Sequence, residues 1–400
     1  MEAVDEQRRV RGAPKDGRSG SGGEMSLLPR FRGVAPEPGE DREVASVREI
    51  LFVELLGGLG DVLISLGAIQ ALARSYPEAR LTVLTFPPGG ALLEHDPLIH
   101  EVVYAPIPGP ARLHSAREAV EEMLTRKDWD LVVSDTSYDG IDGLIRNCGA
   151  PITVDNLWRS PPPDERVDGR FLRILSEEGL IRPEAISPAR LHLTPEEGSA
   201  AAEELAGLRR PLVFLLPDAG MEVKRWPEES WGSLGQALRE RHGADIVVPV
   251  GSDPDQAERV FRLVGERACV WPRGTLRELA AALSFADIAV GADTGPARIA
   301  AALGVPTVTL FGPSWHGRYG QPPPHVDLQG YLDCPQRNVS DFTQQPCWYA
   351  GECTLRKRPW HTCLEDVSAE DVLSAVAPFL QDRSDAGPAI GGEESLGEAR

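Results

Sequence analysis

The stretch Glu49–Asp61, EILFVELLGGLGD, decides the fold of this 400-residue chain. Its mostly apolar opening, Glu49–Leu55, predicts a short buried strand, and the glycines that follow predict a tight turn. We expect a helix to continue from this turn to about Ser75. The order strand, glycine-rich turn and helix is typical of a parallel sheet, in which such a turn brings the backbone close to a ligand at a helix N-terminus.

The same alternation of short apolar runs and helical patterns recurs and then restarts halfway along the chain. The first array has predicted strands over Glu49–Leu55, Arg80–Phe86, Glu101–Tyr104, Leu131–Ser134 and Pro151–Val154. The second array has predicted strands over Pro211–Leu216, Asp245–Val250, Asp287–Val290 and Thr307–Phe311, and helices over Pro227–Arg241, Pro254–Glu266, Leu276–Phe285, Gly295–Leu303 and Ala369–Leu380. Continuous apolar strands separated by helices indicate parallel sheets covered on both faces. We therefore expect an α/β protein of two Rossmann-like, doubly wound domains that face each other across a cleft.

The two arrays join near Leu191–Leu208, and the chain ends lack any periodic pattern. The predicted segments are a tail over 1–47, a first domain over 48–195, a second domain over 196–380 and an acidic tail over 381–400. Both tails are predicted to be disordered, because their charged, Gly- and Pro-rich composition cannot bury enough apolar surface to offset the ordering entropy. Met25 is an alternative start of the chain.

Charge and hydropathy exclude several functions. The formal net charge is −20, from 41 Lys and Arg against 61 Asp and Glu, which argues against binding through nucleic-acid phosphates or an anionic membrane surface. The most apolar stretch, Ile50–Ala73, is interrupted by Glu54, Asp61 and several glycines, so it predicts no membrane span. The first 25 residues contain no signal-peptide pattern. We expect a cytoplasmic protein without stable membrane insertion or a nucleic-acid partner.

The first candidate site is the turn that contains Gly58, Gly60 and Asp61. Glycines here allow close approach of a ligand, although the pattern falls short of a full dinucleotide-binding fingerprint. Asp61 lies in the first turn of the predicted helix, where the helix dipole stabilises a carboxylate. The residue is either a favourable first-turn residue or a reactive acid.

The second candidate is Asp293-Thr294-Gly295-Pro296, which follows a predicted strand. Thr294 is predicted to cap the next helix, and Pro296 suits its first position. The N–H groups at that helix end favour a diphosphate, and Arg298 could add a bidentate contact. A well-capped structural helix explains the same pattern.

The third candidate is Lys224-Arg225-Trp226-Pro227, after the first strand of the second array. Cations at the carboxyl end of a strand suit a second phosphate contact, and Lys224 is one of only four lysines in the chain. Trp226 is expected to pack in the core.

Four cysteines gather near the C-terminus: Cys334, Cys347, Cys353 and Cys363. Their spacing lacks the tight Cys pairs of zinc sites. Both a structural metal and reduced, packed thiols stay open. The sequence contains no Ser/His/Asp arrangement and no Walker A motif.

Taken in order over residues 48–380, these motifs resemble glycosyltransferase family 9, the ADP-heptose heptosyltransferases. The resemblance rests on GGLGDV at 57–62, YPEAR at 76–80, KRWP at 224–227, GADTGP at 291–296, AALGVP at 301–306 and FGPS at 311–314. The cysteine-rich segment before the last helix also resembles the family.

This resemblance implies a GT-B fold, no metal or other cofactor, and inversion at the anomeric carbon. It implies that Asp61 is the catalytic base, that Lys224 contacts the donor diphosphate, and that Asp293, Thr294 and Gly295 hold the donor's phosphates and sugar. Either Asp253 or Asp255 would hold the ribose. Many members carry His where this chain has Arg298, so the donor is expected to be contacted differently there.

The expected activity is transfer of a sugar, heptose from ADP-heptose, to an acceptor hydroxyl. The strongly acidic chain favours a small soluble acceptor such as a natural-product intermediate, and a lipid or cell-surface glycan core is the main rival. A nucleotide-sugar epimerase and a non-catalytic nucleotide-sugar binding protein are the alternative functions.

Overall fold

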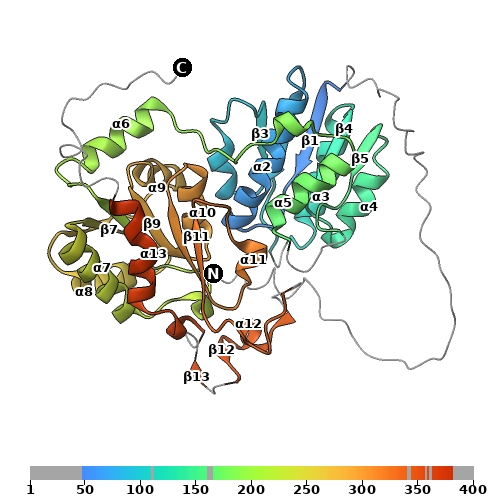
Figure 1. Ribbon diagram of the computed structural model, residues 1–400. Helices are drawn as coiled ribbons and strands as arrows, with labels where there is room; N and C mark the ends of the chain where they lie inside the picture. Colours follow the sequence, from blue (N-terminus) through green and yellow to red (C-terminus); the bar gives the residue numbers. More distant parts are fainter. Residues whose placement is uncertain are drawn as a thin grey trace, which may run out of the picture.

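The computed structural model describes residues 47–109, 112–159, 165–339, 344–355, 358–359 and 363–381. Its first sheet contains five parallel strands in the order β3-β2-β1-β4-β5 (Figure 1). The strands are β1 (Glu49–Val53), β2 (Arg80–Thr85), β3 (Glu101–Tyr104), β4 (Leu131–Ser134) and β5 (Ile152–Val154). The helices around it are α2 (Leu59–Ser75), α3 (Ser115–Arg126), α4 (Ile141–Arg146) and α5 (Val167–Glu177).

Strand β1 is buried on both faces, as its unbroken apolar run predicts. Ile50 and Phe52 pack into the core that contains α2 and α5, whereas Leu51 and Val53 pack against α3 and α4. The turn after β1 needs Gly57, whose φ of 83° lies in the left-handed region that other residues adopt only at a cost.

The second sheet contains six parallel strands in the order β11-β10-β9-β6-β7-β8. The strands are β6 (Leu212–Leu216), β7 (Asp245–Pro249), β8 (Ala268–Trp271), β9 (Ile288–Ala292), β10 (Thr307–Phe311) and β11 (Val326–Gln329). The helices of this half are α6 (Pro195–Glu204), α7 (Glu228–His242), α8 (Pro254–Val264), α9 (Leu276–Leu283), α10 (Gly295–Ala302), α11 (His316–Tyr319) and α13 (Ala369–Gln381). Figure 1 shows the two sheets in two lobes.

Both sheets have the same winding, and this confirms the predicted fold class. In each one, the first strand lies beside the fourth, and the chain runs outward in opposite directions from that pair. Ligands of doubly wound sheets bind at this switch point, beyond the carboxyl ends of the two central strands. The candidate motifs follow β1 in the first sheet and β6 and β9 in the second.

The two lobes share a continuous apolar core. Helix α2 of the first lobe packs against α10 of the second lobe. The connecting segment is attached to the second lobe, because the Leu191 N–H donates to the Ala302 carbonyl oxygen at 2.9 Å. The predicted domain limits, 48–195 and 196–380, stay a prediction.

The structure corrects several expected limits. Val47, assigned to the N-terminal tail, is buried in the core, and α13 continues to Gln381. The strands β8 and β11 were not expected. The remainder of both predicted tails, 1–46 and 382–400, lies outside the described residues.

Candidate active site

The two glycine-rich turns, separated by more than two hundred residues, meet where α2 and α10 begin. Leu59 lies directly over Gly295, so that a Cβ atom on Gly295 would be 2.3 Å from Leu59 Cδ2. A Cβ atom on Gly60 would lie 3.6 Å from the Arg298 side chain. The first and second sequence motifs therefore form one contact between the lobes, and this contact needs a glycine at position 295.

Asp61 lies in the first turn of α2 and is partly exposed. Its Oδ2 accepts the Gly58 N–H at 3.1 Å, while its own N–H donates to the Gly58 carbonyl oxygen at 3.0 Å. The side chain thus satisfies one of the unpaired donors at the helix end. This contact agrees with a first-turn structural role, and it leaves the predicted reactive role open.

Asp293 is the centre of a charged cluster at the switch point of the second sheet. Its Oδ2 accepts from Lys224 Nζ at 2.8 Å and from Ser314 Oγ at 2.5 Å, and Arg298 Nη2 lies 3.8 Å from Oδ1. The carboxylate is 9% exposed. Burial by itself would raise the pKa of Asp293, but Lys224 and Arg298 outweigh it and hold that pKa below its ordinary value. The two cations and one anion leave this cluster a net positive charge.

The structure places Thr294 at the N-cap of α10, but the predicted cap is wrong. The Thr294 hydroxyl donates back to the Ala292 carbonyl oxygen at 3.3 Å, and the side chain accepts no N–H of the helix. Its φ of −146° and ψ of 170° describe extended backbone, which turns the hydroxyl toward the preceding strand. Pro296 is the second helical residue, one position later than predicted.

The residues of the third motif have different surroundings: Lys224 belongs to the charged cluster around Asp293, whereas Trp226 lies in the core. Lys224 Nζ also donates to the Asp293 carbonyl oxygen at 3.2 Å. Arg225 turns to Asp218, at 3.5 Å. Trp226 is fully buried, packs edge-on against Trp231 with ring centroids 4.9 Å apart, and donates to the Val367 carbonyl oxygen, as expected for a core residue.

The two candidate ribose ligands have different surroundings. Asp253 is the N-cap of α8, accepts the N–H groups of Asp255 and Gln256, and contacts Arg259 at 3.2 Å. Burial opposes ionisation, but Arg259 and the two N–H groups keep the pKa of Asp253 below its ordinary value. Asp255 is exposed one residue into the helix.

Sequence reasoning missed the acids behind Asp61. Glu54 directly follows β1, Asp135 directly follows β4, and both side chains are buried. Glu54 Oε2 accepts from Thr85 Oγ1 at 2.6 Å, and burial together with the nearby Asp135 raises the pKa of Glu54 well above its ordinary value. The only signal in the sequence was an acid inside an apolar strand.

Tyr319 was not predicted from the sequence either, although it lies near both Asp61 and Asp293. Burial raises its pKa to about 12, against the effect of Arg318, and Asp61 and Asp293 add to this shift. Its carbonyl oxygen accepts from Arg298. Tyr319 therefore joins the carboxylates of the two lobes in one electrostatic neighbourhood.

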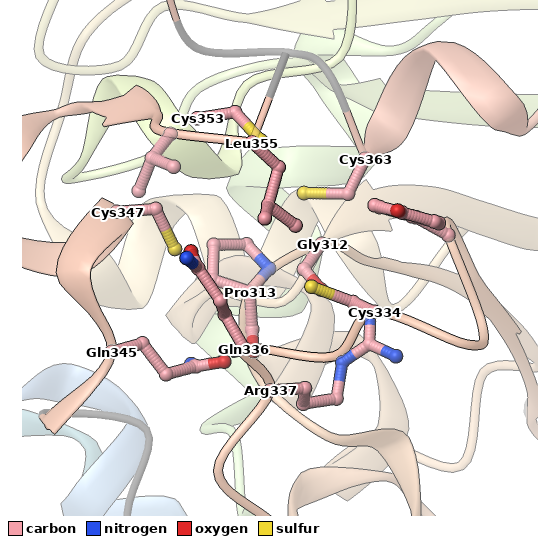
Figure 2. Close-up of a pocket in the computed structure, with 12 residues that line it drawn as sticks. Gly312, Pro313, Cys334, Gln336, Arg337, Gln345, Cys347, Cys353, Leu355 and Cys363 are labelled. Carbon is pink, nitrogen blue, oxygen red and sulfur yellow. Dashed lines mark hydrogen bonds between the residues drawn. The ribbon is translucent and has the colours of Figure 1, made fainter. Parts of the chain in front are cut away.

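The four C-terminal cysteines line a single pocket with Gly312, Pro313 and Arg337, and Figure 2 shows them around it. Burial raises the pKa of Cys363 to about 12 and also raises that of Cys347, so both thiols stay protonated. Within the described residues, no group of three or more His, Cys, Asp or Glu side chains is arranged to hold a metal ion. In the same part of the chain, no helix is both long and apolar enough to cross a membrane.

Comparison with known proteins links this geometry to a family. Residues 175–345 match the model of glycosyltransferase family 9 (heptosyltransferase). Lipopolysaccharide heptosyltransferase 1 of Pseudomonas aeruginosa is 36% identical over 168 residues, which are 41% of this chain and 43% of the relative. Lipopolysaccharide heptosyltransferase 3 of Escherichia coli is 25% identical over 64% of this chain and 82% of the relative.

Solved structures show the same architecture over most of the chain. The glycosyl transferase family 9 structure from Veillonella parvula has a TM-score of 0.70 at 21% identity and covers 84% of this chain and 98% of that one. The Escherichia coli heptosyltransferase WaaC with ADP has a TM-score of 0.59 at 18% identity, over 83% and 99%. The predicted GT-B fold is thus confirmed, and the sequence over residues 175–345 is similar to glycosyltransferase family 9.

Proposed function

We propose that this enzyme transfers heptose from ADP-heptose to an acceptor hydroxyl, with inversion at the anomeric carbon. The relatives that match are named heptosyltransferases, and one similar structure was solved with ADP. The observation that carries the proposal is the cluster of Lys224, Asp293 and Arg298, which lies at the switch point of the second sheet opposite Asp61.

The cluster suits a departing diphosphate. Its net positive charge is fixed in place by Ser314 and by the Asp293 carboxylate, so little reorganisation is needed when negative charge develops on the leaving group. Because these cations belong to the chain itself, we propose that the transfer needs no metal ion. Asp253 or Asp255, at the end of the neighbouring strand, would hold the ribose.

Asp61 would act as the general base. The acceptor oxygen forms a bond to the anomeric carbon, the bond from that carbon to the diphosphate breaks with its electron pair, and the hydroxyl proton moves to the Asp61 carboxylate. The carboxylate is a weak base in water, so proton transfer is expected late, once the acceptor oxygen has become acidic. The Gly58 N–H fixes the side-chain rotamer in which the transfer would occur.

Two classes of acceptor are compatible with this reaction: a saccharide of the lipopolysaccharide core and a small natural product. The relatives' names support a saccharide of the lipopolysaccharide core, and we propose this class first. A small natural-product acceptor, which the acidic composition favoured, has no support among these relatives.

The test is incubation of the purified protein with ADP-heptose and either a heptose-deficient lipopolysaccharide or a small polyol acceptor, with and without EDTA. We expect ADP release and a heptosylated lipopolysaccharide, unchanged by EDTA. Rearrangement of ADP-heptose without any acceptor would instead identify an epimerase. Tight ADP-heptose binding with no reaction on either acceptor would identify a binding protein.

A further inference from the structure

Two buried guanidinium groups from opposite lobes lie against the same indole ring. Arg170, in α5, has no exposed surface, and Arg318, in α11, is 5% exposed. The Arg170 Cζ lies 5.9 Å and the Arg318 Cζ 6.0 Å from the Trp158 ring centroid. Trp158 is itself held edge-on by Phe171. The fold therefore brings two fixed positive charges together where the lobes meet.

Both guanidiniums have N–H donors that nothing in the described chain satisfies. Arg170 Nη1 and Nη2 and Arg318 Nη1 are buried without a hydrogen-bond partner. Among the described residues, Arg170 pairs only with Glu165, at 3.4 Å, and Arg173 already holds both Glu165 oxygens at 2.6 and 3.0 Å. Arg318 Nε donates to Tyr319 Oη at 3.2 Å, and no carboxylate of the described residues forms an ion pair with Arg318.

Such a pair is unfavourable unless something neutralises it. Burial, reinforced by the charge of Arg318, lowers the pKa of Arg170. Buried guanidiniums in folded proteins are normally paired, and an orphaned set of N–H donors in a fixed fork matches a carboxylate or phosphate group. Arg173, one turn further along α5, shows the ordinary arrangement, with both Glu165 and Glu177 as partners.

We propose that Arg170 and Arg318 form a binding site for a phosphate-class oxyanion between the two lobes. The site is separate from the cluster of Lys224, Asp293 and Arg298. Tyr319 lies between the two, because its carbonyl oxygen accepts from Arg298 and its hydroxyl accepts from Arg318. A bound anion would supply the missing acceptors and link α5 to α11, so it would hold the lobes together next to Asp61.

The ligand chemistry can come from two sources. One is a phosphate carried by the sugar that accepts the transferred group, and the other is free inorganic phosphate. Occupancy of the site does not depend on the proposed transfer reaction, so it can be measured whether or not that proposal holds.

The test measures phosphate binding with the donor site already filled. Thermal unfolding of the full chain is followed in saturating ADP while sodium phosphate replaces sodium chloride at constant ionic strength. We expect phosphate to stabilise the unaltered protein, and its apparent affinity to fall at least tenfold in Arg170→Gln and in Arg318→Gln. Arg262→Gln, which removes the same charge from an exposed arginine paired with Glu258 on its own helix, is the matched control and should bind phosphate like the unaltered protein.

Two further outcomes complete the test. Without phosphate, Arg170→Gln should unfold at the same or a higher temperature, since it removes an uncompensated charge; a purely structural Arg170 would give a large loss of stability. Glucose 6-phosphate that binds more tightly than inorganic phosphate would assign the site to a sugar phosphate, and equal binding would assign it to free phosphate. The absence of phosphate stabilisation in the unaltered protein, or its persistence in both variants, would overturn the proposal.

Discussion

The two carboxylates of the proposed active site, Asp61 and Asp293, differ in their burial and in their hydrogen-bond partners. Asp293 is buried among two cations and a hydroxyl, so its charge is fixed in the folded state. Asp61 is partly exposed and accepts the Gly58 N–H of its own helix end. Asp293 is therefore suited to fix the positions of its neighbours, whereas Asp61 is suited to accept a proton. Single substitutions can distinguish these two roles.

Asp61→Asn is expected to abolish transfer while ADP affinity stays within a few-fold of the unaltered protein. The amide oxygen can still accept the Gly58 N–H, so the helix end is preserved, but the amide cannot take the acceptor's proton. Activity assays and ADP calorimetry are the two measurements. A large loss of ADP affinity would make Asp61 a donor ligand instead of a base.

Lys224→Ala is expected to weaken ADP binding roughly 10- to 150-fold, which corresponds to the loss of a charge-assisted hydrogen bond of about 1.5–3 kcal/mol. It also removes the main neutralising charge on buried Asp293. Arg298→His should weaken ADP binding less than Lys224→Ala does. Arg225→Ala is the control, because Arg225 turns to Asp218. Titration of ADP at two salt concentrations measures the effect, and unchanged affinity in Lys224→Ala would remove Lys224 from the site.

Glu54→Gln is expected to stabilise the protein at neutral pH. The folded-state pKa of Glu54 is raised, so the folded chain retains a proton that the unfolded chain loses as the pH rises above about 4.5, and stability falls over that range. The amide oxygen can still accept the Leu56 N–H, and the amide nitrogen can donate to Thr85 Oγ1, without this cost. The melting temperature of the variant should exceed that of the unaltered protein at pH 7 and match it near pH 4.

Glu49→Gln, at the start of β1, should show the opposite trend. Burial opposes ionisation of Glu49, but Lys127 and Arg80 outweigh it and lower its pKa. Its charge therefore stabilises the folded state above the unfolded pKa, and this stabilisation disappears as the pH falls. Parallel pH profiles for the two variants would contradict both assignments.

At the scale of the elements, the sequence predicted all strands of the first sheet and the central strands of the second, and it missed the two edge strands of the second sheet, β8 and β11. The central strands β1, β6, β9 and β10 are buried on both faces, which produces an unmistakable pattern. The edge strands β8 (ACVW) and β11 (VDLQ) are short and only partly buried, and β11 alternates apolar and polar residues, so periodicity alone could not separate them from loops.

The site was predictable only where it follows a strand. Asp61, Lys224 and Asp293 could be proposed from the sequence because each follows a central strand of a parallel sheet. The pairing of Arg170 with Arg318 and the position of Tyr319 depend on how the lobes meet, and no local pattern encodes that. The predicted hydrogen bond from the helix end to the Thr294 side chain does not form, because the backbone enters α10 in an orientation that turns the hydroxyl toward the Ala292 carbonyl oxygen.

Gly295→Ala is expected to destabilise the contact between α2 and α10. The added Cβ would lie 2.3 to 2.8 Å from Leu59 side-chain atoms, including its Cβ, so Leu59 or the helix must shift. Such overpacking is expected to lower the free energy of unfolding by about 1–3 kcal/mol. Leu59→Ala in the same chain should recover part of the loss, and chemical denaturation of the single and double variants measures the coupling.

Gly143→Ala is the control for this prediction. Gly143 lies in α4, and nothing is within 4 Å of a Cβ placed there. Alanine should therefore stabilise that helix by about 0.5–1 kcal/mol. If Gly295→Ala were also neutral or stabilising, the close contact of the two turns would not exist in solution.

At the scale of the whole molecule, the proposed base and the proposed donor cluster belong to different lobes. Their relative position therefore depends on contacts between the lobes, and the Arg277 side chain of α9 reaches from the second lobe to the first. It contacts Glu197 through both oxygens, donates to the His192 carbonyl oxygen at 2.9 Å, and reaches the Ala91 carbonyl oxygen of the first lobe at 3.3 Å.

Arg277→Gln is accordingly expected to reduce transfer at least tenfold while ADP affinity changes less than twofold, because every proposed donor contact lies on the second sheet. The loss of stability should be about 3 kcal/mol, since Glu197 loses the partner that keeps its pKa low. That charge stabilises the folded state above the unfolded pKa of about 4.5, so the difference from the unaltered protein should narrow as the pH falls below it. Transfer rates, ADP calorimetry and melting temperatures at pH 4 and 7 measure these effects.

Arg262→Gln provides the comparison for the loss of an ordinary ion pair. Arg262 is exposed and pairs with Glu258 on the same helix at 3.0 Å, and such pairs contribute about 0.3–0.5 kcal/mol. This variant should retain both transfer and stability. If Arg277→Gln behaved in the same way, the lobes would hold their relative position without Arg277, and the contact between α2 and α10 would suffice to bring Asp61 opposite the donor cluster.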